Sequence, residues 1–154
     1  MEKADLATIN QETIIAKSYD PSGYPLFNSP QEVGEEVKKI GFDVVNLANN
    51  HMLDKGAKGL SEAIDFWNNI GGITMTGAYK DENDMNRLEY IEKDGIKIGL
   101  VGITRYTNGL SLPKDSALKI VNYENHLYDE KNKNWPDLRD FVIEQNNGNQ
   151  FFST

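Results

Sequence analysis

The chain has 154 residues, 38% hydrophobic and 26% charged, which is enough for one domain with a buried core and too apolar for a disordered segment. Its 16 basic and 24 acidic residues give a formal net charge of −8, which argues against nucleic acid and against an anionic membrane surface as partners. The absence of cysteine excludes disulfides, thiolate metal sites and cysteine nucleophiles. No apolar run is long enough to span a membrane, and residues 1–5 contain no apolar signal segment.

Periodic apolar residues divide the first half of the chain into alternating strands and helices. In chain order, we expect a strand at 4–9, a helix after the capping box at 29–32, a strand at 42–48, a helix at about 57–69 and a strand at 73–76. Residues 16–30 contain several proline and glycine residues and are expected to form a loop. Gly41 is expected to end the first helix. Because strand–helix–strand connections are right-handed, this order predicts a parallel sheet.

The second half of the chain does not continue the alternation of strands and helices. Asp94-Gly95 separates two strand-like runs, at 88–93 and 96–104, and predicts a β-hairpin. The end of the second run is typical of a buried strand. Residues from about 106 to 134 are weakly patterned, and residues 137–145 are expected to form a helix with one apolar face.

Two polar clusters follow strands of the predicted parallel sheet. They consist of Asn10 and Glu12 after the first strand, and of Asn49, Asn50, His51 and Asp54 after the second. Because ligands of α/β sheets bind beyond the carboxyl ends of the strands, we expect both clusters to share one edge. Glu12 offers a carboxylate oxygen, Asn50 an amide oxygen and His51 an imidazole that ligates metal or transfers a proton. The set suits Mg²⁺, Mn²⁺, Fe or Zn²⁺, with a metal-activated water attacking a phosphate or an amide.

Four of these residues also have an ordinary structural interpretation. Glu12 suits a solvent-facing carboxylate, and Asp54 suits a helix cap. Asn49 and Asn50 suit a turn, because asparagine tolerates positive φ. The second histidine, His126, lies in weakly patterned sequence and is expected on a surface loop. A phosphate-binding glycine loop and a Gly-x-Ser-x-Gly elbow are both absent from the sequence, so neither competes with the metal hypothesis.

Several segments resemble the CapA family, the poly-γ-glutamate capsule-synthesis proteins related to calcineurin-like metallophosphatases. They are residues 5–13, 24–30 and 41–56, the last containing Ala-Asn-Asn-His, together with Gly77-Ala78 and the hairpin at Asp94-Gly95. The resemblance covers roughly residues 4–108, and residues 123–154 diverge from it.

The resemblance implies a partial metallophosphatase-like fold of class α/β, from a four-layer αββα sandwich, with a βαβαβ first half followed by a β-hairpin. It also implies divalent metal ions, two of them in the full-length protein. The residues that match the family motifs would have these roles: Glu12 and Asn50 as metal ligands, His51 as the catalytic acid or charge stabiliser, and Asn10, Asn49 and Asp54 in support.

Parts of the family pattern have no match in this sequence. A strand ending in Gly-Asp, upstream of the Asn-x-Glu motif at Asn10, and the later histidine segments are both missing. We therefore expect residues 1–154 to form a single CapA-like domain that is incomplete at both ends, and we expect this fragment to be inactive alone.

The resemblance suggests two functions. The first is a metal-dependent hydrolase-like protein of capsule or poly-γ-glutamate biosynthesis or turnover, acting on an anionic polymer or on a phosphate or γ-glutamyl substrate. The alternative is a non-catalytic component that binds polymer or other capsule-synthesis proteins. The family implies an extracytoplasmic or membrane-associated location for the full-length protein, whereas this chain shows no signal or anchor.

Overall fold

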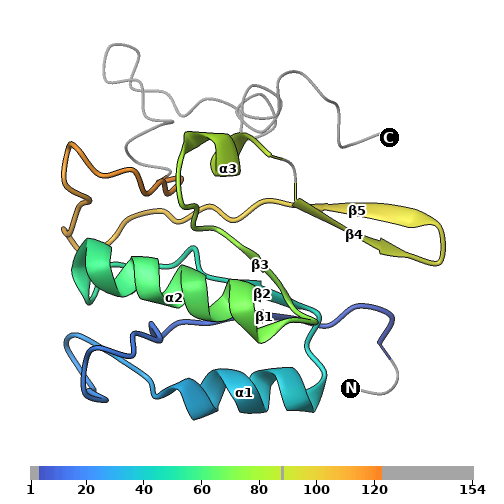
Figure 1. Cartoon of the computed structure of the whole chain (residues 1–154), viewed down its shortest axis with the longest axis horizontal. Coiled ribbons are helices and arrows are strands. Elements are labelled where there is room, and N and C mark those ends of the chain that lie inside the picture. Colours follow the sequence, from blue (N-terminus) through green and yellow to red (C-terminus); the bar gives the residue numbers. More distant parts are fainter. Residues whose placement is uncertain (1–3, 88, 123–154) are drawn as a thin grey trace.

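The structure, a computed structural model, describes residues 4–87 and 89–122 (Figure 1). Its elements are β1 (Thr8–Asn10), α1 (Gln31–Ile40), β2 (Val44–Asn46), α2 (Gly56–Ile70), β3 (Thr74–Thr76), α3 (Glu82–Asn86), β4 (Glu89–Lys93) and β5 (Ile96–Leu100). The helix expected at 137–145 and the surface loop expected around His126 lie outside the described residues. Within the described ranges, no helix is long and apolar enough to cross a membrane.

The three short strands of the first half form a parallel sheet in the order β1-β2-β3, which confirms the βαβαβ prediction. The register aligns Ile9, Val45 and Met75 in one row across the sheet. Because successive side chains of a strand point to opposite faces, this apolar row lies on one face. The neighbouring rows therefore lie on the other face, and the row at the carboxyl end is Asn10, Asn46 and Thr76.

Helices α1 and α2 pack against the apolar face of the sheet (Figure 1). Val45 of β2 and Trp67 of α2 are fully buried in the shared core, to which α1 contributes Val37. A glycine in α1 allows the close packing of this layer. A Cβ on Gly34 would lie 2.3 Å from the Phe66 ring, so α1 approaches α2 more closely than an alanine would permit.

The predicted elements that fall within the described residues are correct in type and differ at their ends. Helix α2 extends one residue beyond the prediction at each end, and Gly41 ends α1 in a left-handed conformation at φ 94°. The predicted capping box is wrong, because the N-cap of α1 is Pro30 and no side chain caps the helix. The Ser29 hydroxyl instead contacts the Thr13 hydroxyl at 2.6 Å, which ties the loop to the segment after β1.

The opening strand starts later than predicted. Its expected first residues lie outside β1, because the Ala7 N–H donates to the Asp43 carboxylate at 2.8 Å rather than to a neighbouring strand. Helix α3, which the sequence did not predict, begins at Glu82. Its N-cap is Asp81, whose side chain accepts a hydrogen bond from the Asp84 N–H.

The hairpin prediction is confirmed by β4 and β5, which pair antiparallel around Asp94 and Gly95, both with positive φ. The hairpin forms a second sheet that extends away from the three parallel strands (Figure 1). The predicted buried strand end is wrong, because β5 ends at Leu100 and Val101 is 42% exposed. The mixed α/β arrangement, a parallel sheet followed by a hairpin, agrees with a partial metallophosphatase-like fold.

The chain beyond β5 returns to the parallel sheet at Gly102, which lies against Gly77 after β3. A Cβ at Gly102 would lie 2.4 Å from the Cα of Gly77 and 2.6 Å from Oδ1 of Asn46. Asn46 Oδ1 is itself held in place, since it also accepts the Ala48 N–H at 3.1 Å. A side chain at Gly102 therefore has no room.

We predict that Gly102→Ala lowers the free energy of unfolding by about 1–3 kcal/mol, because backbone atoms rather than a flexible side chain must move. Chemical denaturation of the 154-residue chain measures this effect. Gly23→Ala is the matched control, since a Cβ at Gly23 meets nothing within 4 Å. Equal stability of the two variants would contradict the packing described for Gly102.

Candidate functional site

The carboxyl ends of β1 and β2 lie next to each other, as the sequence predicts, and bring the two polar clusters to one edge of the sheet. We call this edge the rim; it consists of Asn10, Glu12, Asn49, Asn50, His51 and Asp54. Asn10 and Glu12 are both exposed, and Asn10 Nδ2 donates to Glu12 Oε2 at 2.8 Å. Glu12 therefore faces solvent, as its ordinary interpretation holds, while it stays tied to the end of β1.

Asn49 is a buried scaffold residue that joins the segments following β1 and β2. Its Nδ2 donates to the Gln11 carbonyl at 2.8 Å, and its Oδ1 accepts the His51 N–H at 2.9 Å. Asn49 and Asn50 lie in the bend and turn that follow β2, as their interpretation as turn residues expects, but neither is among the described residues with positive φ. The side chain of Asn49, rather than its backbone freedom, shapes this segment.

Asp54 is the most deeply buried charged residue of the rim, with a side chain that is 0% exposed. Its Oδ2 accepts two hydrogen bonds, from the Phe27 N–H at 2.7 Å and from Nδ1 of His51 at 2.8 Å. Its interpretation as a helix cap is wrong, because the N-cap of α2 is Lys55 and no side chain bonds there. Asp54 instead connects the loop over 16–30 to the histidine.

The contacts of His51 determine its tautomer and hold its ring. A carboxylate only accepts hydrogen bonds, so Nδ1 carries the proton that is donated to Asp54. Nε2 is then the nitrogen that can accept a proton or ligate a metal. The ring of Phe27 meets the imidazole edge-on, with 4.7 Å between ring centroids and an interplanar angle of 80°. His51 is 14% exposed and is therefore accessible but restrained.

Asn108 belongs to this site although the sequence analysis did not single it out. Its Oδ1 accepts a hydrogen bond from Asn50 Nδ2 at 3.1 Å, and its Nδ2 lies 3.3 Å from His51 Nδ1. The signal that could have found it is the dipeptide Asn108-Gly109, since Asn-Gly is a strong turn signal. It was overlooked because it lies in a stretch without hydrophobic periodicity.

The donors at the rim suit a hard divalent cation, but they are few. Asn50 Nδ2 is occupied by Asn108, so Asn50 can offer its Oδ1 to a cation, and Glu12 adds a carboxylate. Within residues 4–87 and 89–122, no three His, Asp or Glu side chains gather closely enough to hold a metal ion. The residues therefore fit part of a metal site whose other ligands would have to come from elsewhere.

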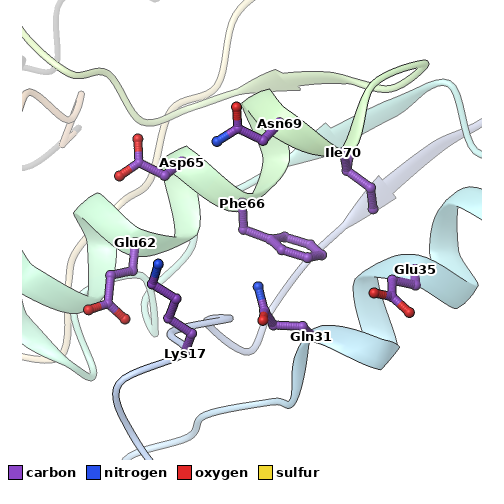
Figure 2. A pocket seen from close by; sticks show the side chains of 8 residues that line it. All are labelled: Lys17, Gln31, Glu35, Glu62, Asp65, Phe66, Asn69 and Ile70. Carbon is purple, nitrogen blue, oxygen red and sulfur yellow. The ribbon is translucent and has the colours of Figure 1, made fainter.

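A separate pocket of about 300 Å³ lies between α1 and α2, and no rim residue lines it. In Figure 2 the ring of Phe66 extends from α2 toward α1, with acidic side chains on either side. Two of these carboxylates already have partners: Glu62 accepts the Ser18 N–H at 2.9 Å, and Asp65 pairs with Lys80 at 2.7 Å. Hydrogen bonding by Ser18 lowers the pKa of the Glu62 carboxyl against the opposing effect of burial. The pocket is therefore a weaker candidate than the rim.

Comparison with known proteins agrees with the resemblance that the rim motifs carry. Residues 1–147 match the family model described as "Bacterial capsule synthesis protein PGA_cap". The chain belongs to this family. Over 77 residues it is 34% identical to the capsule biosynthesis protein CapA of Bacillus anthracis, and the aligned part is 50% of this chain and 18% of that protein.

The family match reaches further along the chain than the rim motifs do. It extends to residue 147 and so passes beyond the stretch of roughly 4–108 in which the resemblance is strongest. The aligned part spans less than a fifth of the length of the Bacillus anthracis relative. Membership of the capsule synthesis family is thus established for the chain, whereas the reaction, the metal and the roles of the rim residues are matters for proposal.

We predict that Asp54→Ala lowers the free energy of unfolding by about 2–4 kcal/mol, because the Phe27 N–H and the His51 ring lose their common acceptor. Denaturant titration checks the value. Glu12→Ala is the control and should stay within about 0.5 kcal/mol of the unmodified chain, because Glu12 is exposed. If Asp54→Ala is as harmless as Glu12→Ala, the buried carboxylate does not hold the rim together.

Proposed function

We propose that this chain provides part of the active site of a capsule-synthesis protein that hydrolyses a phosphate ester or a γ-glutamyl amide with a bound divalent metal ion. The observation that carries the proposal is the hydrogen bond between His51 Nδ1 and the buried Asp54, at the same edge of the sheet as Glu12 and Asn50. Family membership supports a role in capsule synthesis and a place at the cell envelope.

Glu12 and Asn50 would hold the ion, one through a carboxylate oxygen and the other through Oδ1. Mn²⁺, Fe, Zn²⁺ or Mg²⁺ at this position would act as a Lewis acid and lower the pKa of a bound water. Asn10 supports Glu12 through its hydrogen bond to Oε2, and Asn49 supports the backbone of His51 through Oδ1. Two ions, as the family resemblance implies, would need further ligands beyond these residues.

His51 would act on the proton of the reacting group. Asp54 keeps the Nδ1 proton in place and orients the ring, so that Nε2 is free to accept a proton or, once protonated, to give one to the leaving group. The edge-on contact of Phe27 restricts rotation of the imidazole. A histidine held by a buried carboxylate is pre-positioned for proton transfer rather than free to search for its geometry.

An anionic substrate would need a bound cation at the site, because the chain itself is acidic. The chain has a formal net charge of −8, so a phosphate or a polyglutamate chain would be repelled without positive charge at the site. A divalent ion between the rim and the substrate would offset this repulsion. The proposed substrate class and the proposed metal therefore depend on each other.

A second function, a non-catalytic component that binds polymer or a partner protein, is favoured by one observation. The described residues contain no group of three His, Asp or Glu side chains at metal-binding distance, so the rim alone offers few ligands. In this case a single ion at the rim would bridge an anionic polymer to the chain without hydrolysis.

We predict that Mn²⁺ raises the melting temperature of the 154-residue chain, because an ion that binds the folded state stabilises it by mass action. Glu12→Gln and Asn50→Leu should each abolish this shift. The control is Glu32→Gln, since Glu32 is an exposed carboxylate in the first turn of α1. A shift of equal size in all variants places the ion elsewhere, and a shift with polyglutamate but not with Mn²⁺ favours the binding component.

We also predict that the 154-residue chain turns over phosphodiester and γ-glutamyl substrates little or not at all in the presence of Mn²⁺. The physical reason is that the described residues offer few metal ligands, since the Glu12 carboxylate and the Asn50 amide alone would hold an ion weakly. Product release from a chromogenic phosphodiester measures this. Robust Mn²⁺-dependent cleavage that His51→Ala abolishes would show that the chain is a complete catalyst and overturn the prediction.

A further inference from the structure

The hairpin of β4 and β5 carries apolar residues on one face only. Because directly paired residues of an antiparallel ladder point to the same side, one face consists of the pairs Glu89–Leu100, Ile91–Ile98 and Lys93–Ile96. We call this face the isoleucine face. The opposite face carries Tyr90, Glu92, Lys97 and Gly99. The hairpin is therefore amphipathic, with four apolar side chains gathered on one side.

The isoleucine face has no cover among the described residues. Ile96 is 64% exposed, and Ile91, Ile98 and Leu100 are partly exposed. Within residues 4–87 and 89–122, none of these four belongs to a buried apolar cluster or packs against one. A two-stranded sheet is only marginally stable in water unless another layer covers its apolar face. Since the hairpin also extends away from the parallel sheet (Figure 1), we expect a partner to pack on this face.

The two charged residues of the isoleucine face lie at opposite ends of β4. Lys93 lies next to the turn at the tip, and Glu89 lies at the base. Arg87 contacts Glu89 through Oε1 alone, with Nη2 at 2.6 Å and Nε at 3.0 Å, so Oε2 remains for a second cation. Asp84 lies 3.2 Å from the same guanidinium. The base thus holds two carboxylates and one guanidinium and is negative, whereas Lys93 makes the tip of this face positive.

This distribution of charge is complementary to itself. A second hairpin can lie on the isoleucine face after rotation about a two-fold axis that runs across the strands, which places β4 over β4 and β5 over β5. Glu89 of each copy then faces Lys93 of the other. Ile91 and Ile98 each face their own counterparts, and the apolar residues of β5 meet one another. Both ion pairs and the whole apolar surface are therefore matched in one arrangement.

The other two-fold arrangement is unfavourable. An axis along the strands would place β4 of one copy over β5 of the other. Glu89 would then face Leu100, and Lys93 would face Ile96, so that each charge would lose water without gaining a charged partner. Burial of an unpaired charge is costly, and the antiparallel arrangement is therefore selected.

We propose that the isoleucine face binds a second copy of this chain, with the two hairpins packed face to face and base to tip. Such an interface uses the same residues on both copies and closes as a dimer. It includes no rim residue and no residue of the pocket between α1 and α2, except that it lies next to neither in the sheet order. The inference is therefore independent of the proposed function.

Sedimentation velocity of the 154-residue chain over a range of concentrations measures this association. An ionic strength of about 0.15 M is suitable, because it screens the repulsion between two copies that each carry a formal net charge of −8. Lys93→Glu should weaken the dimer about tenfold or more, since like charges then meet twice in each interface. Lys97→Glu is the matched control, because it makes the same charge change on the opposite face and should leave the dissociation constant unchanged.

A charge exchange tests the arrangement itself. Glu89→Lys should self-associate as weakly as Lys93→Glu. An equimolar mixture of the two variants should recover the dimer, because every contact between the ends of β4 then joins opposite charges. Failure of the mixture to associate more tightly than either variant alone would overturn the base-to-tip arrangement.

Two further outcomes would overturn the proposal as a whole. One is equal association of Lys93→Glu and Lys97→Glu, and the other is an unmodified chain that stays monomeric. Hydrogen exchange of such a monomer would identify the true cover of the isoleucine face. Slow exchange of the β4 and β5 amides would assign it to another segment of the same chain, and fast exchange would assign it to a different protein.

Discussion

The rim depends on one buried carboxylate, that of Asp54. With none of its side chain exposed, it accepts hydrogen bonds from the Phe27 N–H and from His51 Nδ1. A buried anion without such donors would be costly, so the loop over 16–30 and the segment after β2 must meet at this point. The same bonds fix the tautomer of the histidine, which is the form that the proposed proton transfer would need.

The two faces of the parallel sheet carry different residues, apolar on the face that the helices cover and polar at the carboxyl end of the other face. Ile9, Val45 and Met75 align toward the helices and form the core, while the row at the carboxyl end of the other face begins with Asn10 and Asn46. Because strands of three residues offer little pairing energy by themselves, the helices that cover the apolar face hold the strands in register. The core thus places the strand ends, and hydrogen bonds among the polar residues beyond them then orient the side chains.

Local sequence signals predicted most of this fold and part of the site. Apolar periodicity located α1, α2 and the parallel strands, and Asp94-Gly95 located the hairpin, because these signals act within one element. The meeting of Glu12 and His51 at one edge followed from the topology of parallel strands. The contact of Asp54 with the Phe27 N–H and the contact of Asn108 with Asn50 were not predictable, since they join residues 27 and 58 positions apart and carry no local sequence signal. Ser29 was misread for the same reason, because its partner, Thr13, lies in a different segment.

The central claim is that the rim, and not the acidic pocket between α1 and α2, binds a divalent cation. Paramagnetic broadening of amide resonances by substoichiometric Mn²⁺ tests it most directly, because broadening is strongest next to the ion. The account predicts that signals of Glu12, Asn50 and Asn108 broaden first, while those of Glu35 and Glu62 persist. Broadening centred on Glu35 and Glu62, or spread evenly over exposed carboxylates, would contradict it.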